Sequence, residues 1–178
     1  GIGKTVLAVR VARQLAAAGR FEDARLYLDL RGAAPHPLDP AAALGSLLAA
    51  VAGPDPRRPA DAETLAGLWR AAIQGKDALL LLDNAANAAQ VKPLLPGCPS
   101  CAVLVTSRQR FTLPGAILID LERMPEKEAR ALLQTLAPRL DDAGADDIAR
   151  LCGGLPMSLR IAGNYLALND DCSVAEYA

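Results

Sequence analysis

The sequence predicts an α/β fold, in which helices cover both faces of a parallel sheet, followed by a small subdomain of helices alone. Two apolar runs, residues 78–82 and 102–106, predict the sheet, because they are short and alternate with segments of helical period. The first run is apolar at every position, which is typical of parallel strands buried on both faces. After about residue 123 only helical patterns remain. We therefore expect an α/β domain over 1–122 and a helical subdomain over 123–178.

The first part of the α/β domain is predicted to form a helix, a strand and two further helices. Apolar residues recur at helical spacing directly after Thr5, and Gly19 is a suitable residue to end that helix. Leucines alternate with polar residues over 25–30, which predicts a strand with one buried face. Alanine and leucine dominate 41–52, a predicted helix, and Asp61 is the expected N-cap of the next one.

The second part of this domain supplies the remaining strands. We expect a fourth strand over 116–120 in addition to the two apolar runs, because Ala-Ile-Leu-Ile-Asp has strand composition. A short helix over 85–94 is expected to follow the first run. In the subdomain, Pro125 and Pro156 are suitable first residues of helices, and Asp146 is expected to open a helix between them.

Composition excludes several classes of protein. The chain is 52% hydrophobic and 22% charged, which is typical of a globular protein and not of a disordered one. Its 19 basic and 20 acidic residues give a net charge of −1, so electrostatics give no reason to expect nucleic acid or an anionic membrane as the partner of this segment. The longest uncharged stretch, 41–54, is shorter than the roughly 20 residues of a membrane helix. We expect a cytoplasmic protein.

The cysteines do not form the dense pattern of a disulfide scaffold. Cys98 and Cys101 have the CxxC spacing of zinc and redox sites, but zinc needs two more ligands, and Cys152, Cys172 and His36 stand alone along the chain. We interpret the pair as a tight turn between a helix and a strand in a reducing compartment, where the thiols are free, and a zinc or redox role is the alternative.

Gly3, Lys4 and Thr5 match the end of a phosphate-binding loop. Glycines let backbone N–H groups turn toward phosphates, the following helix adds positive partial charge, Lys pairs with phosphate and Thr reaches Mg²⁺. Gly1 and Gly3 stand directly before a strongly periodic helix, which favours this interpretation. The alternative is a glycine-rich helix start that binds nothing.

Two further residues belong to the same predicted edge of the sheet. Asp83 follows the buried run 78–82, where a carboxylate is placed to orient Mg²⁺ and its water. Arg108 follows the next strand and is placed to contact a γ-phosphate. Taken singly, Asp83 is explained by helix capping and Arg108 by solvation in a loop. Together with the glycine-rich start, Asp83 predicts the paired motifs of a P-loop NTPase.

Four motifs in this order resemble the NB-ARC (AP-ATPase) module of the STAND nucleotide switches. They are Gly-Ile-Gly-Lys-Thr at 1–5, Leu-Leu-Leu-Leu-Asp-Asn at 79–84, Val-Thr-Ser-Arg at 105–108 and Cys-Gly-Gly-Leu-Pro-Met-Ser-Leu at 152–159. The chain is most similar to the NB-ARC modules of bacterial transcriptional regulators of the AfsR/SARP type. The likeness covers nearly the whole chain and extends to the family style of residues 27–32 and 82–91.

This resemblance implies a fold, a ligand and a role for each motif. The fold would be a P-loop NTPase sheet whose first, central strand precedes residue 1, flanked by the strands that hold Arg108 and Ile117. The chain would then begin inside the phosphate-binding motif, and alone it would be marginally stable. The residues implied to hold ADP or ATP are Gly1, Ile2, Gly3, Lys4, Thr5, Val6, Arg108 and Pro156, and those implied for Mg²⁺ are Thr5 and Asp83.

The resemblance also implies a regulatory switch. ADP would hold a closed form and ATP would release it, with self-association, so that the partners are adenine nucleotide, a second copy, and the effector and sensor domains of the parent chain. Asn84 departs from the family where many relatives carry a second acid, and an amide is a poor general base. With Asp83, Asn84 and Arg108 as catalytic residues we therefore expect slow hydrolysis at most. The alternative is a catalytically inactive P-loop scaffold or interaction module.

Overall fold

The computed structural model describes residues 2–57 and 59–169. The chain divides into two compact units, one over Thr5–Leu118 and the other formed by Ile119–Ala178 with Gly1–Lys4. Each unit is treated by itself below. Among the described residues, no helix combines the length and the apolar character that crossing a membrane requires.

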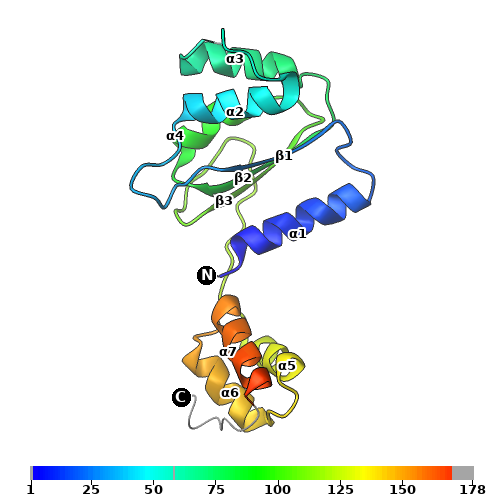
Figure 1. Cartoon of the computed structure of the whole chain (residues 1–178), viewed down its shortest axis with the longest axis vertical. Coiled ribbons are helices and arrows are strands. Elements are labelled where there is room, and N and C mark those ends of the chain that lie inside the picture. The colour runs from blue at the N-terminus through cyan, green and yellow to red at the C-terminus, as the bar shows by residue number, and fades with distance from the viewer. Residues whose placement is uncertain (1, 58, 170–178) are drawn as a thin grey trace. The chain divides into compact units, whose positions relative to one another are not determined.

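The first unit is built on a parallel sheet of three strands (Figure 1). The strands β1 (Ala24–Asp29), β2 (Ala78–Ala85) and β3 (Ala102–Ser107) lie in the order β1-β2-β3. Every pairing is parallel, so all three carboxyl ends lie at one edge of the sheet. The α/β class and the parallel sheet predicted from the sequence are confirmed.

Helices lie on both sides of this sheet (Figure 1). The helices α2 (Pro40–Ala52) and α3 (Ala62–Ile73) lie on one side, and α1 (Lys4–Ala17) lies on the other. The short helix α4 (Ala88–Val91) continues directly into the 3₁₀ turn η1 (Lys92–Leu94). Since Ala8 is the one buried residue of α1, this helix covers its side of the sheet only loosely.

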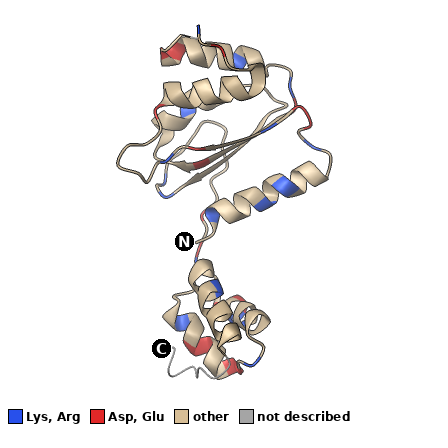
Figure 2. Cartoon of the chain, viewed as in Figure 1, with Lys and Arg blue, Asp and Glu red and all other residues tan. Residues whose placement is uncertain are grey.

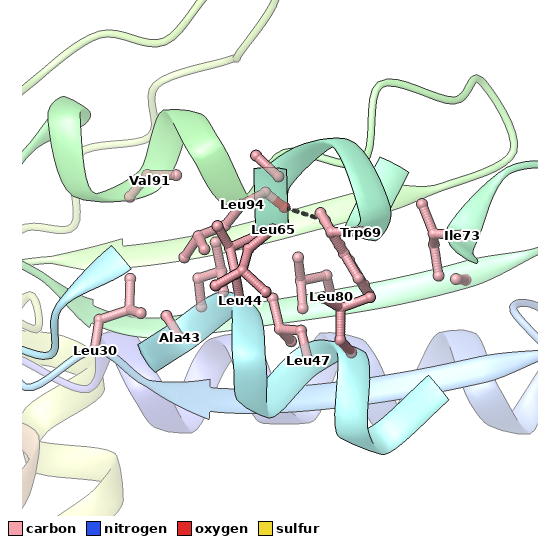
Figure 3. Close-up of a cluster of buried hydrophobic side chains, with 14 of the residues drawn as sticks. Leu30, Ala43, Leu44, Leu47, Leu65, Trp69, Ile73, Leu80, Val91 and Leu94 are labelled. Atoms are coloured by element: carbon pink, nitrogen blue, oxygen red, sulfur yellow. Dashed lines mark hydrogen bonds between the residues drawn. The ribbon is translucent and has the colours of Figure 1, made fainter. Parts of the chain in front are cut away.

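The core of the unit lies between the sheet and the α2–α3 layer (Figure 3). Trp69 on α3 is fully buried, and its indole Nε1–H donates a hydrogen bond of 2.9 Å to the Leu94 carbonyl. This bond satisfies the polar atom of an otherwise apolar side chain, which allows it to occupy the centre of the core. Leu44 and Leu47 from α2 pack in the same cluster.

One predicted element of this unit does not form, and another begins later than predicted. The strand expected over 116–120 does not form, and Ile117 and Ile119 are 89% and 73% exposed. A strand needs a neighbour for its backbone hydrogen bonds, and within the described residues none pairs with this segment. The helix expected over 85–94 begins later, because β2 continues to Ala85, where Ser107 pairs with it.

The second unit packs three helices around its own core. These are α5 (Glu126–Leu136), α6 (Asp142–Leu151) and α7 (Pro156–Leu168). The prediction that Asp146 opens the middle helix is wrong, because Asp141 is the N-cap and its carboxylate accepts the Gly144 N–H.

Asp146 instead binds an arginine across two helices. The Arg130 Nε donates to it at 2.7 Å, and a second guanidinium nitrogen completes a bidentate pair. These hydrogen bonds raise the pKa of Arg130, so the pair stays charged throughout the range in which the carboxylate is ionised.

The CxxC segment forms the predicted turn, but the expectation of free thiols is corrected. Cys98 and Cys101 form a disulfide, and the Cys101 N–H donates to the Cys98 carbonyl across the turn. Cys152 is free and half-buried, and burial raises the pKa of its thiol. Cys172 lies outside the described residues. The part of the chain that the structure describes holds no group of three or more His, Cys, Asp or Glu side chains suited to a metal ion.

Candidate functional site

The candidate site lies at the carboxyl edge of the sheet, where α1 meets the end of β2. The Thr5 hydroxyl donates a hydrogen bond of 2.8 Å to Asp83 Oδ1, although 78 residues separate the two in sequence. Thr5 lies in the first turn of α1, and Asp83 lies near the end of β2. The contact brings Thr5, the last residue of the glycine-rich motif, to the strand-end acid.

Two more hydroxyl groups surround the same carboxylate. Thr106 on β3 donates to Asp83 Oδ1, and the Tyr27 hydroxyl donates to Asp83 Oδ2 at 3.2 Å. Asp83 is only 6% exposed, so these two donors, together with Thr5, replace the water that a buried carboxylate needs. Both oxygens of Asp83 are therefore fixed in direction.

Tyr27 and Thr106 were not singled out in the sequence analysis. Tyr27 occupies the exposed side of an alternating strand, at 57% exposure, and pairs in register with Leu81, two residues before Asp83. Side chains alternate between the two faces of a strand, so this parallel register places Tyr27 and Asp83 on the same face of the sheet. Partial desolvation of the phenol raises the pKa of Tyr27, and the negative charge of Asp83 raises it further, so the phenol keeps the proton that it donates.

The backbone beside Asp83 is irregular. The register of β2 against β3 shifts between Leu82 and Ala85, and Asn84 has φ +55°, in the left-handed region. Its N–H donates to the Thr106 hydroxyl at 2.9 Å, and its side-chain amide donates to Asp29 Oδ1 at 3.5 Å. This bend turns Asn84 toward β1 and away from the regular ladder.

Gly32 is required at the same edge. Its N–H donates to the Asn84 carbonyl at 2.6 Å, and a Cβ atom on it would lie 2.2 Å from the backbone nitrogen of Ala86. Only glycine permits this approach of two backbones. The close contact fixes the chain after β1 against the bend in β2.

The start of α1 has the chemistry of an anion-binding helix terminus. Gly3 has φ +96°, and no atom lies within 4 Å of the position that a Cβ would take. The helix that follows has 14 residues, and its charged side chains are all basic: Lys4, Arg10 and Arg13 (Figure 2). A helix of this length has positive partial charge and open N–H groups at its start. Its hydroxyl and carboxylate neighbours are oxygen donors of the kind that Mg²⁺ accepts.

Other predicted residues are not brought into this cluster. Arg108 follows β3 in a bend and is exposed, and no hydrogen bond or ion pair joins it to Asp83 among the described residues. Val6 is 65% exposed on α1, and Ile2 precedes that helix without regular structure. Pro156 is the first residue of α7 in the helical unit.

Gly1 lies outside the described residues. The roles predicted for it and for Ile2, Val6, Arg108 and Pro156 stay predictions.

Comparison with known proteins relates the chain to bacterial regulators. It is 43% identical over 183 aligned residues to regulatory protein AfsR of Streptomyces coelicolor, and equally to regulatory protein AfsR of Streptomyces griseus. The whole chain is covered, but it spans only 18% and 19% of the length of these relatives. A search of protein-family models gave no match. The chain is thus related to one segment of much longer regulatory proteins.

Proposed function

We propose that this chain is the nucleotide-binding and first helical segment of a STAND-type regulatory ATPase, a switch that holds ADP or ATP with Mg²⁺. The hydrogen bond from Thr5 to Asp83 carries the proposal, because it joins the glycine-rich helix start to the strand-end acid. In a P-loop site these two residue types orient Mg²⁺ and its water. The relation to long regulatory proteins supports a regulatory role.

The residues present fit a nucleotide with its metal. Gly1, Gly3 and the first N–H groups of α1 would hold phosphate, with Lys4 as the counter-charge. Mg²⁺ keeps several waters and uses one or two protein oxygens together with phosphate oxygens, so Thr5 and Asp83 suffice without a larger set of acids. Bound Mg²⁺ would neutralise charge on the phosphates. The three hydroxyls around Asp83 hold its oxygens in place, which supports the proposal.

The regulatory consequence follows from differential affinity. A ligand shifts a conformational equilibrium only by as much as it prefers one state over the other. We expect Arg108, directly after β3, to sense the γ-phosphate, and Pro156 in the helical unit to lie against the adenine of bound ADP and so tie that unit to the nucleotide state. The proposed partners are adenine nucleotide, a second copy of the protein on activation, and the effector and sensor domains of the parent chain, with transcription as the regulated process.

The nucleotide content of the purified full-length protein tests this function. Denaturation should release nearly one ADP or ATP per chain from the wild type and little from the Lys4→Ala variant. Lys127→Ala removes the same charge from an exposed position on α5 and is the matched control. Absence of nucleotide from the wild type, together with no binding of added Mg-ATP, contradicts the proposal.

An inactive scaffold is the second candidate function. Asn84 favours the scaffold, because its amide stands where a water-activating acid is expected and is a poor general base. A scaffold of this kind would retain its partners when Lys4 is replaced. A switch would lose the nucleotide-dependent difference between its two states.

A further inference from the structure

The carboxyl edge of the sheet carries a second carboxylate in surroundings unlike those of Asp83. Asp29 ends β1 and pairs in register with Asp83 on β2. Paired residues of parallel strands project from the same face, and adjacent strands lie about 4.8 Å apart. The two carboxylates therefore stand side by side, but Asp83 is buried under three hydroxyls and Asp29 is exposed.

These surroundings suit the two acids to different tasks. Asp83 accepts hydrogen bonds at both oxygens, from Thr5 and Thr106 at Oδ1 and from Tyr27 at Oδ2. A carboxylate occupied in this way is well placed to orient a cation and poorly placed to take a proton from water. Asn84, the next residue, has an amide that offers no basic atom.

Asp29 has the complementary arrangement. Its Oδ1 accepts the Arg31 backbone N–H at 2.8 Å and the Asn84 amide at 3.5 Å. No hydrogen bond to its Oδ2 is found within residues 2–57 and 59–169. One oxygen thus anchors the side chain against the bend at Asn84, and because the residue is exposed, the other oxygen is left for a water molecule.

We propose that Asp29 is the proton acceptor for hydrolysis of ATP, with Asn84 as the residue that positions it. The inference rests on the proposed nucleotide-binding function. The water oxygen forms a bond to the γ-phosphorus while the bond from that phosphorus to the β–γ bridging oxygen breaks. The electron pair of that bond leaves on ADP, and the proton of the water passes to the Asp29 carboxylate and then to solvent.

The Asp29→Asn variant of the full-length protein tests the role. Asparagine still accepts the Arg31 N–H, so the turn after β1 is kept and only the basic oxygen is lost. Asp55→Asn is the matched control, since Asp55 Oδ1 accepts the Arg57 N–H two residues on in the same way, at 2.9 Å. We expect single-turnover hydrolysis to fall about 100-fold in Asp29→Asn, because a general base contributes about 10²–10⁴-fold. Asp55→Asn should hydrolyse at the wild-type rate.

A readout other than rate separates chemistry from binding. The Kd for Mg-ATP of Asp29→Asn should stay within about threefold of wild type, as expected when only a proton acceptor is lost. The purified variant should carry ATP where the wild type carries ADP. Thermal unfolding of the variant, compared with Asp55→Asn, reports whether the substitution disturbs the fold.

The exchanged pair gives the second test. Adding Asn84→Asp to the Asp29→Asn variant returns a carboxylate to the same place from the neighbouring strand. The double variant should hydrolyse ATP at least about tenfold faster than Asp29→Asn alone. Recovery supports the role of a carboxylate here, and its absence contradicts it. The inference also fails if Asp29→Asn hydrolyses bound ATP within about threefold of wild type, or if the wild type binds ATP without hydrolysing it. Failure of the wild type to bind any nucleotide contradicts instead the proposed function itself.

Discussion

Replacing Thr106 by valine tests the polar network around Asp83. Valine has nearly the same shape, so the packing of β3 is kept while the hydroxyl is lost. That hydroxyl makes two hydrogen bonds, donating to Asp83 Oδ1 and accepting the Asn84 N–H at 2.9 Å. A bond to a charged group contributes about 1.5–3 kcal/mol and a neutral one about 0.5–1.5 kcal/mol. Their loss should destabilise this edge by about 2–4.5 kcal/mol, or about 30- to 2,000-fold in the opening equilibrium.

Hydrogen exchange with mass spectrometry on the full-length protein measures this locally. Peptides that cover residues 80–86 should exchange faster in Thr106→Val by about that factor, and Thr106→Ser should restore protection. The matched control is Thr135→Val on α5, whose hydroxyl donates to the carbonyl of Ala131 on its own helix. Equal exchange of residues 80–86 in Thr106→Val and Thr135→Val would refute the reasoning, because the hydroxyl would then contribute nothing to the edge.

Three other predictions concern stability. Trp69→Phe keeps an aromatic ring but loses the indole donor to the end of η1, and should lower the free energy of unfolding by about 1–3 kcal/mol in chemical denaturation. Gly154→Ala should destabilise the helical unit by about 1–3 kcal/mol in thermal unfolding, because φ is +64° and a Cβ would lie 2.8 Å from a backbone oxygen; Gly45→Ala, where nothing lies within 4 Å, should not. Asp61 caps α3, and hydrogen bonds from Thr64 hold its pKa below the ordinary 3.8. The stability that it contributes is therefore fully present above pH 3.8 and lost as the pH falls through the lowered pKa, whereas Asp61→Asn should lack this pH dependence.

Elements with a strong local pattern could be predicted from the sequence. The continuous apolar run of β2 predicts a strand buried on both faces, and the apolar period of α3 predicts a helix with one buried face. The structure confirms both. The segment 116–120 has strand composition too, but a strand forms only where a neighbour completes its hydrogen bonds, and composition does not contain that information. The disulfide of Cys98 and Cys101 was missed because CxxC spacing alone fits a turn, a metal site or a disulfide.

The candidate site was predictable in part for a related reason. Thr5 and Asp83 belong to sequence motifs that predict their roles, and the structure brings the two residues into contact. Tyr27 and Thr106 come from neighbouring strands, 56 and 23 residues away from Asp83 in sequence, so their role depends on the register of the sheet. Asn84 was noted as a departure from an acidic pattern, but its contact with Asp29 depends on a left-handed bend that no sequence pattern predicts.

The two carboxylates at this edge explain why an amide is tolerated between them. A residue that orients a cation must stay ionised and fixed, which three hydroxyl donors achieve for Asp83. A residue that accepts a proton must have an oxygen open to water, which the exposed Asp29 has. An acid at position 84 would add a third negative charge beside these two, and like charges at such distances repel. Asn84 instead donates to Asp29 and lowers that repulsion, so its amide is consistent with a hydrolytic site whose base comes from the neighbouring strand.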